Sequence, residues 1–181
     1  MKSITVENLL GNHKSYTQVT GDEEALKRVI QTGEINRPGF ELAGFFKHSD
    51  FRRIIVFGDK EMAFIAEMSE ERQKEIFPCL INEEVPCIVI CKGHECPKVL
   101  KDVANERNFP IFQTELITGA VSSELMNTLE EKLAKDTLMH GVFLNIHGKG
   151  VIIKGDSGIG KSEIALELVK RGHLLVADDA V

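Results

Sequence analysis

The sequence predicts an α/β fold: an amino-terminal α/β domain with a partly parallel sheet over residues 1–130, followed by a second, smaller domain over residues 131–181. Two observations predict it. In the first part, short apolar runs of strand length alternate with helical patterns, an alternation typical of parallel sheets. In the second part, a glycine-rich run lies between an apolar strand pattern and an amphipathic helix pattern.

The composition is that of an ordinary globular chain. It has 181 residues, of which 43% are hydrophobic and 28% are charged, enough for one domain or two small ones. The net charge of −6 argues against nucleic acid and anionic membranes as partners, because both require clustered Lys and Arg. No apolar run approaches the roughly 18 residues of a membrane span, and the amino end lacks the apolar core of a secretory signal. We therefore expect a cytoplasmic protein.

Four apolar runs in the first part have the length of strands and end at Gly, Pro or charged residues. They are RRIIVFGD (residues 52–59), MAFIAEM (62–68), VPCIVICKG (85–93) and FPIFQTE (109–115). We expect these runs to supply the sheet.

Helical patterns lie around these runs. Residues 22–34 have acidic residues in the first turn, apolar residues on one side and Gly33 as a stop. Residues 69–86 contain Pro78, which predicts a short helix that ends just before it. Residues 97–110 again place apolar residues at helical spacing.

A longer connecting helix is expected within residues 118–141. Its apolar residues recur every four positions, and they are Val121, Leu125, Leu129 and Leu133. Ser122 or Ser123 is the expected cap at its start. The Met and Leu stripe favours packing over recognition, and the domain boundary falls within or just after this helix.

The cysteines cluster between residues 79 and 96 and include His94 in their range. They are Cys79, Cys87, Cys91 and Cys96. A metal site is one interpretation, but the spacing lacks the paired C-x-x-C of zinc sites, and VPCIVIC reads as a buried strand. We therefore favour reduced, structural cysteines.

From Gly141, the run GVFLNIHGKGVIIKG predicts two strands joined by a tight turn at HGKG. The second strand leads into GDSGIGKS, in which Gly155, Gly160, Lys161 and Ser162 match the phosphate-loop pattern G-x-x-x-x-G-K-[ST]. A helical pattern follows over residues 161–172. Its expected apolar face consists of Ile164, Ala165, Leu168 and Val169.

The chemistry of a phosphate site requires these residue types. Glycines allow successive backbone N–H groups to converge on an oxygen, and a helix start directs partial positive charge to the same point. Lys161 can reach the β and γ phosphates, and the Ser162 hydroxyl can ligate Mg²⁺. The expected phosphate-binding residues are Gly155, Asp156, Ser157, Gly158, Ile159, Gly160, Lys161 and Ser162. The alternative is an exposed glycine-rich turn without a ligand.

Two adjacent acids, Asp178 and Asp179, follow the apolar run HLLVA. In a strand–loop–helix–strand unit the return strand runs parallel to the first, so its carboxyl end lies on the phosphate-loop edge. A carboxylate there can hold Mg²⁺ or accept a proton from an attacking hydroxyl. Because successive strand residues point to opposite sides, only one of the two needs to face the nucleotide.

Two stretches of the sequence resemble a known protein family. Residues 138–181, which include GDSGIGKS and KRGHLLVADDAV, resemble the start of the catalytic domain of the bacterial HPr kinase/phosphorylase family, and INRPGFELAGFF (35–46) resembles a stretch of its amino-terminal domain. The resemblance implies a P-loop kinase domain that uses ATP or pyrophosphate with Mg²⁺ to phosphorylate a serine of the phosphocarrier HPr. It also implies removal of that phosphate by phosphorolysis, regulation of carbon catabolite repression, and a homohexamer.

The resemblance also assigns roles to individual residues. Asp179 would be the base that deprotonates the HPr serine and the acid that reprotonates it in reverse. Lys161 would steady the phosphates, Ser162 would ligate Mg²⁺, and His140 would lie in the active site. The spacing of residues alone does not select His140, because a lone histidine before a strand is usually structural or solvent-exposed.

The family's catalytic domain continues well past Val181, with a further acidic Mg²⁺ ligand, an active-site arginine and most hexamer contacts. We therefore expect an exposed apolar face and weak order in the second part. Two alternatives stay open: another P-loop ATP-dependent kinase or NTPase, and, for this chain, a non-catalytic binding module. For Arg37–Gly44 a structural loop is favoured over a binding site.

Overall fold

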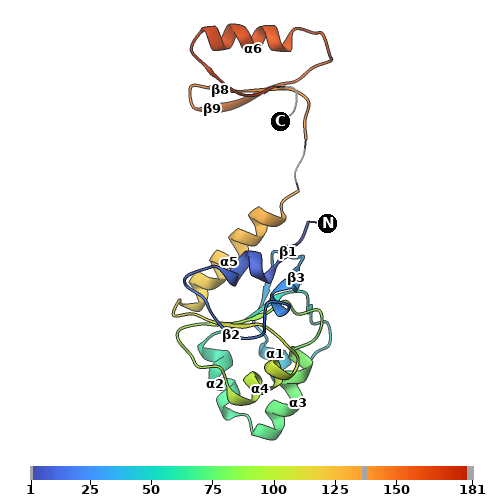
Figure 1. Cartoon of the computed structure of the whole chain (residues 1–181), viewed down its shortest axis with the longest axis vertical. Helices are drawn as coiled ribbons and strands as arrows, with labels where there is room; N and C mark the ends of the chain where they lie inside the picture. The colour runs from blue at the N-terminus through green and yellow to red at the C-terminus, as the bar shows by residue number, and fades with distance from the viewer. Residues whose placement is uncertain (1, 136–137, 179–181) are drawn as a thin grey trace. The chain divides into compact units, whose positions relative to one another are not determined.

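The computed structural model describes residues 2–135 and 138–178, and the chain divides into two compact units, Met1–Ala134 and Lys135–Val181. Figure 1 shows the elements of both units, which we describe separately as unit 1 and unit 2.

Unit 1 is built on a five-stranded mixed sheet with the strand order β2-β7-β6-β5-β4. Its strands are β2 (Thr17–Thr20), β4 (Ile35–Asn36), β5 (Ile54–Phe57), β6 (Ile88–Ile90) and β7 (Ile111–Gln113). Strands β4 to β7 are parallel, and β2 pairs antiparallel with β7. The prediction of an α/β fold with a partly parallel sheet is therefore confirmed. A separate antiparallel pair joins β1 (Ile4–Thr5) to β3 (Val29–Ile30).

Helices cover both faces of this sheet. One face carries α1 (Gly39–Leu42), α2 (Asp59–Glu67), α3 (Glu70–Leu80) and α4 (Lys98–Glu106). The other face carries α5 (Thr118–Leu133) together with two short turns, η1 (Glu7–Gly11) and η2 (Ala25–Lys27). Figure 1 shows α5 and the chain's first segments on the opposite side of the sheet from α2, α3 and α4. The strands alternate accordingly, with Ile55 and Phe57 packed in the first core cluster and Ile54 and Val56 in the second.

The prediction of a strand at residues 62–68 is wrong, because these residues belong to α2. The Glu61 carboxylate accepts a hydrogen bond from the Gly58 N–H at 2.9 Å, which satisfies a donor at the helix start. Met62 and Ile65 then face the core at a spacing of three residues, whereas Phe64 is 44% exposed. The apolar residues of MAFIAEM therefore belong to a helix with one buried side, not to a strand.

The helix expected at residues 22–34 is also wrong, because only the turn η2 forms before β3. Asp22 accepts hydrogen bonds from the N–H groups of Glu24 and Ala25, so the segment begins as expected. The Arg28 side chain then donates to the carbonyls of Asn82 and Val85, and Ile30 pairs with Ile4. These distant partners override the local helical pattern.

The prediction of a helix that ends before Pro78 is wrong, because α3 continues through Pro78 to Leu80. Phe77 and Leu80 are fully buried, so the last turn is needed for core packing. The Arg107 guanidinium donates to the carbonyls of Pro78 and Ile81 at 2.7 and 2.5 Å. This distant side chain satisfies terminal carbonyls, which offsets part of the cost of an internal proline.

Helix α5 forms as predicted, with Val121, Leu125 and Leu129 buried. The expected serine cap is wrong. The helix begins at Thr118, and Ser122 lies inside it, where its hydroxyl donates to the Thr118 carbonyl at 2.8 Å.

The cysteines are free thiols, and Cys87 and Cys91 are fully buried next to β6. Burial raises the pKa of Cys91 to about 11. Within the described ranges, no group of three or more His, Cys, Asp or Glu side chains is placed to hold a metal. The buried thiols behave as small apolar side chains.

The Arg37–Gly44 segment is tied to its surroundings at both ends. Arg37 forms an ion pair with the buried Glu61 at 2.6 Å. Gly44 has φ +95°, and the Arg72 guanidinium donates to the neighbouring Ala43 carbonyl. These contacts give the segment a structural role.

Unit 2 contains a three-stranded antiparallel sheet of order β10-β8-β9 with one helix. Its elements are β8 (Val142–Ile146), β9 (Lys149–Ile153), α6 (Lys161–Lys170) and β10 (Leu174–Ala177). The predicted hairpin is confirmed, with His147 at φ 51° and Gly148 at φ 81° in its two-residue turn. No helix in the described parts of the chain is long and apolar enough to cross a membrane.

The core of unit 2 is small, because among its described residues the buried cluster consists of Val142, Leu144 and Ala165. Several large apolar side chains are exposed, and they include Ile159, Ile164, Leu166, Leu174, Leu175 and Val176. An exposed apolar surface was expected here, and the burial values agree with that expectation.

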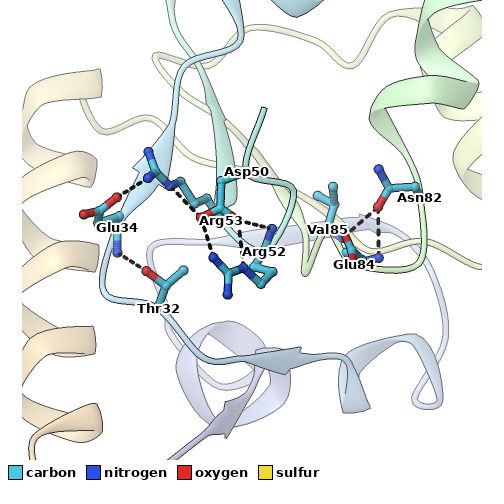
Figure 2. A network of polar contacts seen from close by, with 8 residues as sticks. All are labelled: Thr32, Glu34, Asp50, Arg52, Arg53, Asn82, Glu84 and Val85. Atoms are coloured by element: carbon cyan, nitrogen blue, oxygen red, sulfur yellow. Dashed lines mark hydrogen bonds and ion pairs between the residues drawn. The ribbon is translucent and has the colours of Figure 1, made fainter. Parts of the chain in front are cut away.

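Figure 2 shows polar contacts in the segments that lead into β4 and β5 of unit 1. Asp50 forms a two-bond pair with Arg52 at 2.9 Å for both bonds, and Arg53 lies between Asp50 and Glu34. Beside it, the Asn82 side chain accepts hydrogen bonds from the N–H groups of Glu84 and Val85 (Figure 2). The hydrogen bonds from Arg52, reinforced by the positive charges of Arg52 and Arg53, lower the pKa of Asp50 to about 2.

The lowered pKa of Asp50 predicts that this residue makes a pH-dependent contribution to the stability of unit 1. A carboxyl group with a lowered folded-state pKa stabilises the fold above its unfolded-state pKa of 3.8, and loses that contribution as the pH falls through about 2. The difference in unfolding free energy between wild type and Asp50→Asn should be constant above about pH 5 and shrink between about pH 4 and 2. Denaturant titrations can follow this through the fluorescence of Tyr16, the chain's single tyrosine and a buried residue of unit 1. Asp102→Asn, exposed on α4, is the control; an equal pH dependence in both variants would contradict the assignment.

Candidate functional site

The glycine-rich loop of unit 2 connects β9 to α6, as the sequence predicts. Two of its glycines, Gly158 and Gly160, have φ of 82° and 96°, in the left-handed region that side chains disfavour. Gly160 is the N-cap of α6, and its carbonyl accepts the Ile164 N–H at 3.1 Å. The chain can therefore turn sharply from the strand into the helix and present the first N–H groups of α6 to the loop.

Lys161 is the first residue of α6, and its side chain folds back over the loop. Its ammonium group donates to the carbonyls of Gly155 and Asp156 at 2.8 and 2.7 Å. These two bonds hold the positive charge of Lys161 over the loop. The first N–H groups of α6, which have no partner within the helix, lie beside it in the chain. A lysine charge beside a helix start is an arrangement that favours an anion.

Helix α6 is held to the sheet by part of the predicted apolar face. Ala165 is buried and Leu168 packs against the cluster of Val142 and Leu144. Ile164 and Val169, which belong to the same predicted apolar face, are 52% and 37% exposed. The three-stranded sheet offers too little surface to cover them.

An open cavity of about 470 Å³ lies against this loop. Its lining residues come from the start of β8, the loop, α6 and the end of β10, and they are His140, Gly141, Val142, Gly155, Ser157, Lys161 and Asp178. The site thus brings together four side chains expected from the sequence, namely His140, Ser157, Lys161 and Asp178, together with the backbone of Gly155.

The strand directions explain this convergence. Strands β9 and β10 are both antiparallel to β8, so they run in the same direction and end at the same edge. The start of β8 lies between those ends, since Val142 pairs with Ile153 and Phe143 with Ala177. The segment before β8, the loop after β9 and the residue after β10 therefore meet.

The remaining expected site residues are distributed differently. Asp156, Gly158, Ile159, Gly160 and Ser162 do not line the cavity, and Ser162 is exposed on the first turn of α6. Asp179 lies outside the described residues.

The sequence reasoning missed Gly141 and Val142 as parts of the site. Gly141 is buried, and a Cβ placed on it would lie 2.7 Å from the Ile153 carbonyl oxygen. Only glycine permits this approach of two backbones, which places the chain before β8 beside the loop. The signal in the sequence was a glycine directly before an apolar strand.

The fold of both units and the loop between β9 and α6 define an α/β protein in which a glycine-rich loop with the sequence pattern of a phosphate loop connects a strand to a helix. The chain belongs to the HPr serine kinase family: residues 4–129 match the HPr serine kinase N terminus, and residues 131–181 match the HPr serine kinase C-terminal domain.

Several curated relatives carry the name HPr kinase/phosphorylase. The protein of an Exiguobacterium species is 46% identical over 164 residues, covering 91% of this chain and 53% of the relative. That of Enterococcus faecalis is 43% identical over 176 residues, covering 97% of this chain and 55% of the relative. The chain thus spans about half the length of these relatives. Among solved structures, the CBS and DRTGG regulatory region of Clostridium perfringens pyrophosphatase is similar, with 17% identity and a TM-score of 0.45, over 70% of this chain and 49% of that one.

The left-handed conformation of Gly160 can be tested by substitution. Gly160→Ala should destabilise the loop by about 1–2 kcal/mol, because a Cβ disfavours that conformation although nothing within 3.5 Å blocks it. The expected result is faster amide hydrogen exchange in the first turns of α6, measured by NMR. Gly119→Ala in α5, at a glycine without positive φ, is the control. Unchanged exchange in Gly160→Ala would show that the residue does not need this conformation.

Proposed function

We propose that this chain takes part in a bifunctional serine kinase/phosphorylase reaction. In one direction a phosphoryl group passes from ATP or pyrophosphate to a serine of the phosphocarrier protein HPr; in the other, inorganic phosphate removes it to give pyrophosphate. The observation that carries the proposal is the cavity beside the loop, which His140, Lys161 and Asp178 line together. Membership of the HPr serine kinase family supports the choice of protein substrate.

The residues of the loop suit a phosphate group. The N–H groups at the start of α6 lack partners within the helix and can donate to phosphate oxygens. The Lys161 ammonium, now bonded to two loop carbonyls, is close enough to the loop to exchange one of these bonds for a phosphate oxygen. The absence of side chains at Gly158 and Gly160 leaves space for close approach of the ligand.

In the kinase direction, the serine Oγ forms a bond to the transferred phosphorus while the bond from phosphorus to the donor's bridging oxygen breaks. The proton of the serine hydroxyl passes to a carboxylate, for which Asp179 is the proposed acceptor. In the reverse direction the same carboxyl group returns the proton to the serine oxygen. Asp178 and His140 both line the cavity, where each can orient the reacting groups.

The Ser162 hydroxyl is the proposed ligand for Mg²⁺, which prefers hard oxygen donors. When bound, this ion would neutralise charge on the phosphates. The exposed position of Ser162 on the first turn of α6 leaves its hydroxyl available for that role.

The wider context of the proposal rests on the resemblance of residues 35–46 and 138–181 to the family. It comprises a homohexamer in the bacterial cytoplasm and the regulation of carbon catabolite repression. The reversible phosphorylation of HPr is the chemical step through which such regulation would act.

Nucleotide binding by the chain tests the loop directly. Lys161→Met should weaken the binding of MgATP and of magnesium pyrophosphate roughly tenfold or more, because a hydrogen bond to a charged group contributes about 1.5–3 kcal/mol. Isothermal titration calorimetry measures the affinities. Lys170→Met, at the other end of α6, keeps the same change of charge and should bind like wild type. If wild type binds neither ligand, the loop is not a phosphate site in this chain and the binding-module alternative is favoured.

Phosphoryl transfer requires a second test, since the chain spans half of its relatives. Residues 135–181 can replace the corresponding segment of the Exiguobacterium relative, and the hybrid can be incubated with labelled ATP and purified HPr. A serine of HPr should be labelled, and Lys161→Met in the hybrid should slow labelling roughly 100-fold or more. Release of free phosphate with HPr unlabelled would favour a different P-loop ATPase activity.

A further inference from the structure

A second candidate site lies in unit 1, at the carboxyl ends of strands β6 and β7. The connection after β6 leads to α4 on one face of the sheet, and the connection after β7 leads to α5 on the other face. In open α/β sheets, ligands bind in the crevice where neighbouring connections separate in this way. A cavity of about 510 Å³ lies at this edge, lined by residues 113–116 at and after the end of β7, by Gly93 after β6, and by Lys14, Ser15 and Thr17 before and at the start of β2.

The wall of this cavity between β6 and β7 is held rigidly. Lys92 and Gly93 both have positive φ, of 62° and 66°, and their N–H groups donate to the carbonyls of Leu116 and Thr114 at 2.9 Å each. The Gln113 side-chain amide donates to the His94 carbonyl at 2.7 Å. The turn after β6 is therefore fastened to the loop after β7 by three hydrogen bonds, so the cavity is preformed.

The charged groups around the cavity fall into two kinds. Asp59 pairs with Lys92 and with His94, at 2.9 Å in the latter case, and these three groups fix the turn to the start of α2. Lys14 and Glu115 differ, since neither forms a hydrogen bond or ion pair through its side chain with any residue that the structure describes. Both line the cavity. One ammonium and one carboxylate thus remain uncommitted there.

The neighbouring polar groups extend this pair of charges. Ser15 and Thr17 supply hydroxyl groups next to Lys14 in the sequence, and together they can bind an anionic group. The Gln113 amide oxygen lies with Glu115 on the β7 side and can accept hydrogen bonds from an amine or a hydroxyl. The cavity volume is in the range typical of small-molecule sites.

We propose that this cavity binds a small polar metabolite that carries an anionic group, held by Lys14 with Ser15 and Thr17, and a hydrogen-bond-donating amine or hydroxyl group, held by Glu115 and Gln113. The site is independent of the phosphate loop, because all its residues belong to unit 1. Two sources share this chemistry, namely amino acids and hydroxylated phosphate esters, and the experiment separates them.

The test is an NMR titration of the whole chain with four probes. L-Threonine carries a carboxylate with an ammonium group, and glycerol 3-phosphate carries a phosphate with hydroxyl groups. Acetate and glycerol each carry one half of the required chemistry. We expect L-threonine, glycerol 3-phosphate or both to shift the amide signals of Gly93, Gln113 and Thr114 with saturation near 1 mM or below, a scale of about 4 kcal/mol. Acetate and glycerol should bind at least roughly tenfold more weakly, because each leaves one charged group unpaired.

Variants identify the groups that bind. Lys14→Gln should weaken every anionic probe that binds roughly tenfold or more, because it removes the charge that pairs with the anion. Glu115→Gln should weaken L-threonine by a similar factor and glycerol 3-phosphate less, because only the former presents an ammonium group. Lys74→Gln and Glu106→Gln, exposed on α3 and α4, are matched controls and should change nothing.

Three results would overturn the proposal: no saturable shift with any probe up to about 10 mM, equal affinity for glycerol and for the anionic probes, or unchanged affinity in Lys14→Gln. Lys161→Met should leave these titrations unchanged. Failure of the phosphate-loop function and failure of this site are therefore separate outcomes.

Discussion

Burial of the central parallel strands on both faces is the constraint on which unit 1 depends. Every residue of β5 and β6 is at most 2% exposed, so neither strand can leave a face to water. Parallel neighbours also require long crossover connections, and the helices of those connections supply the covering layers. Polar residues are thereby excluded from both faces and gather where the strands end. The ion pairs Arg37–Glu61 and Asp59–Lys92 lie at that edge for this reason.

In unit 2 the strands are only partly buried. The geometry of its glycine-rich loop depends on backbone conformation and not on a large core. Val142, Leu144 and Ala165 form a small buried cluster, whereas Leu174, Leu175 and Val176 along β10 are exposed. The loop conformation is defined by Gly158 and Gly160 in left-handed conformations and by the close approach at Gly141. Strand pairing and glycine stereochemistry are local, so the loop geometry can form around a core this small.

The sequence predicted correctly the elements that depend on local turn chemistry or on regular spacing. The predictions were wrong where contacts with residues far away in the chain determine the secondary structure. The hairpin around His147–Gly148 and helix α5 follow from turn chemistry and spacing, and both form as expected. Pro78 lies inside α3 because Arg107 binds the terminal carbonyls and Phe77 must be buried. Residues 22–34 fail as a helix because Arg28 donates to carbonyls more than 50 positions away. The contacts of Arg107 and Arg28 leave no signal in the local sequence of the segments whose structure they determine.

The same distinction applies to the candidate site. The phosphate loop carries a local pattern, so Gly160 and Lys161 can be selected from the sequence alone. His140 was expected from the family resemblance alone and Gly141 was missed, because both reach the site through the pairing of β8 with β9 and β10, which brings the chain before β8 between two strand ends. Each unit therefore places chemical groups at the carboxyl ends of strands for a topological reason. In unit 2 two strands end beside the start of a third, and in unit 1 two connections separate toward opposite faces of the sheet. Polar side chains at such edges are released from core packing, so Lys14 and Glu115 can line a cavity in unit 1 and Lys161 can fold over the loop in unit 2.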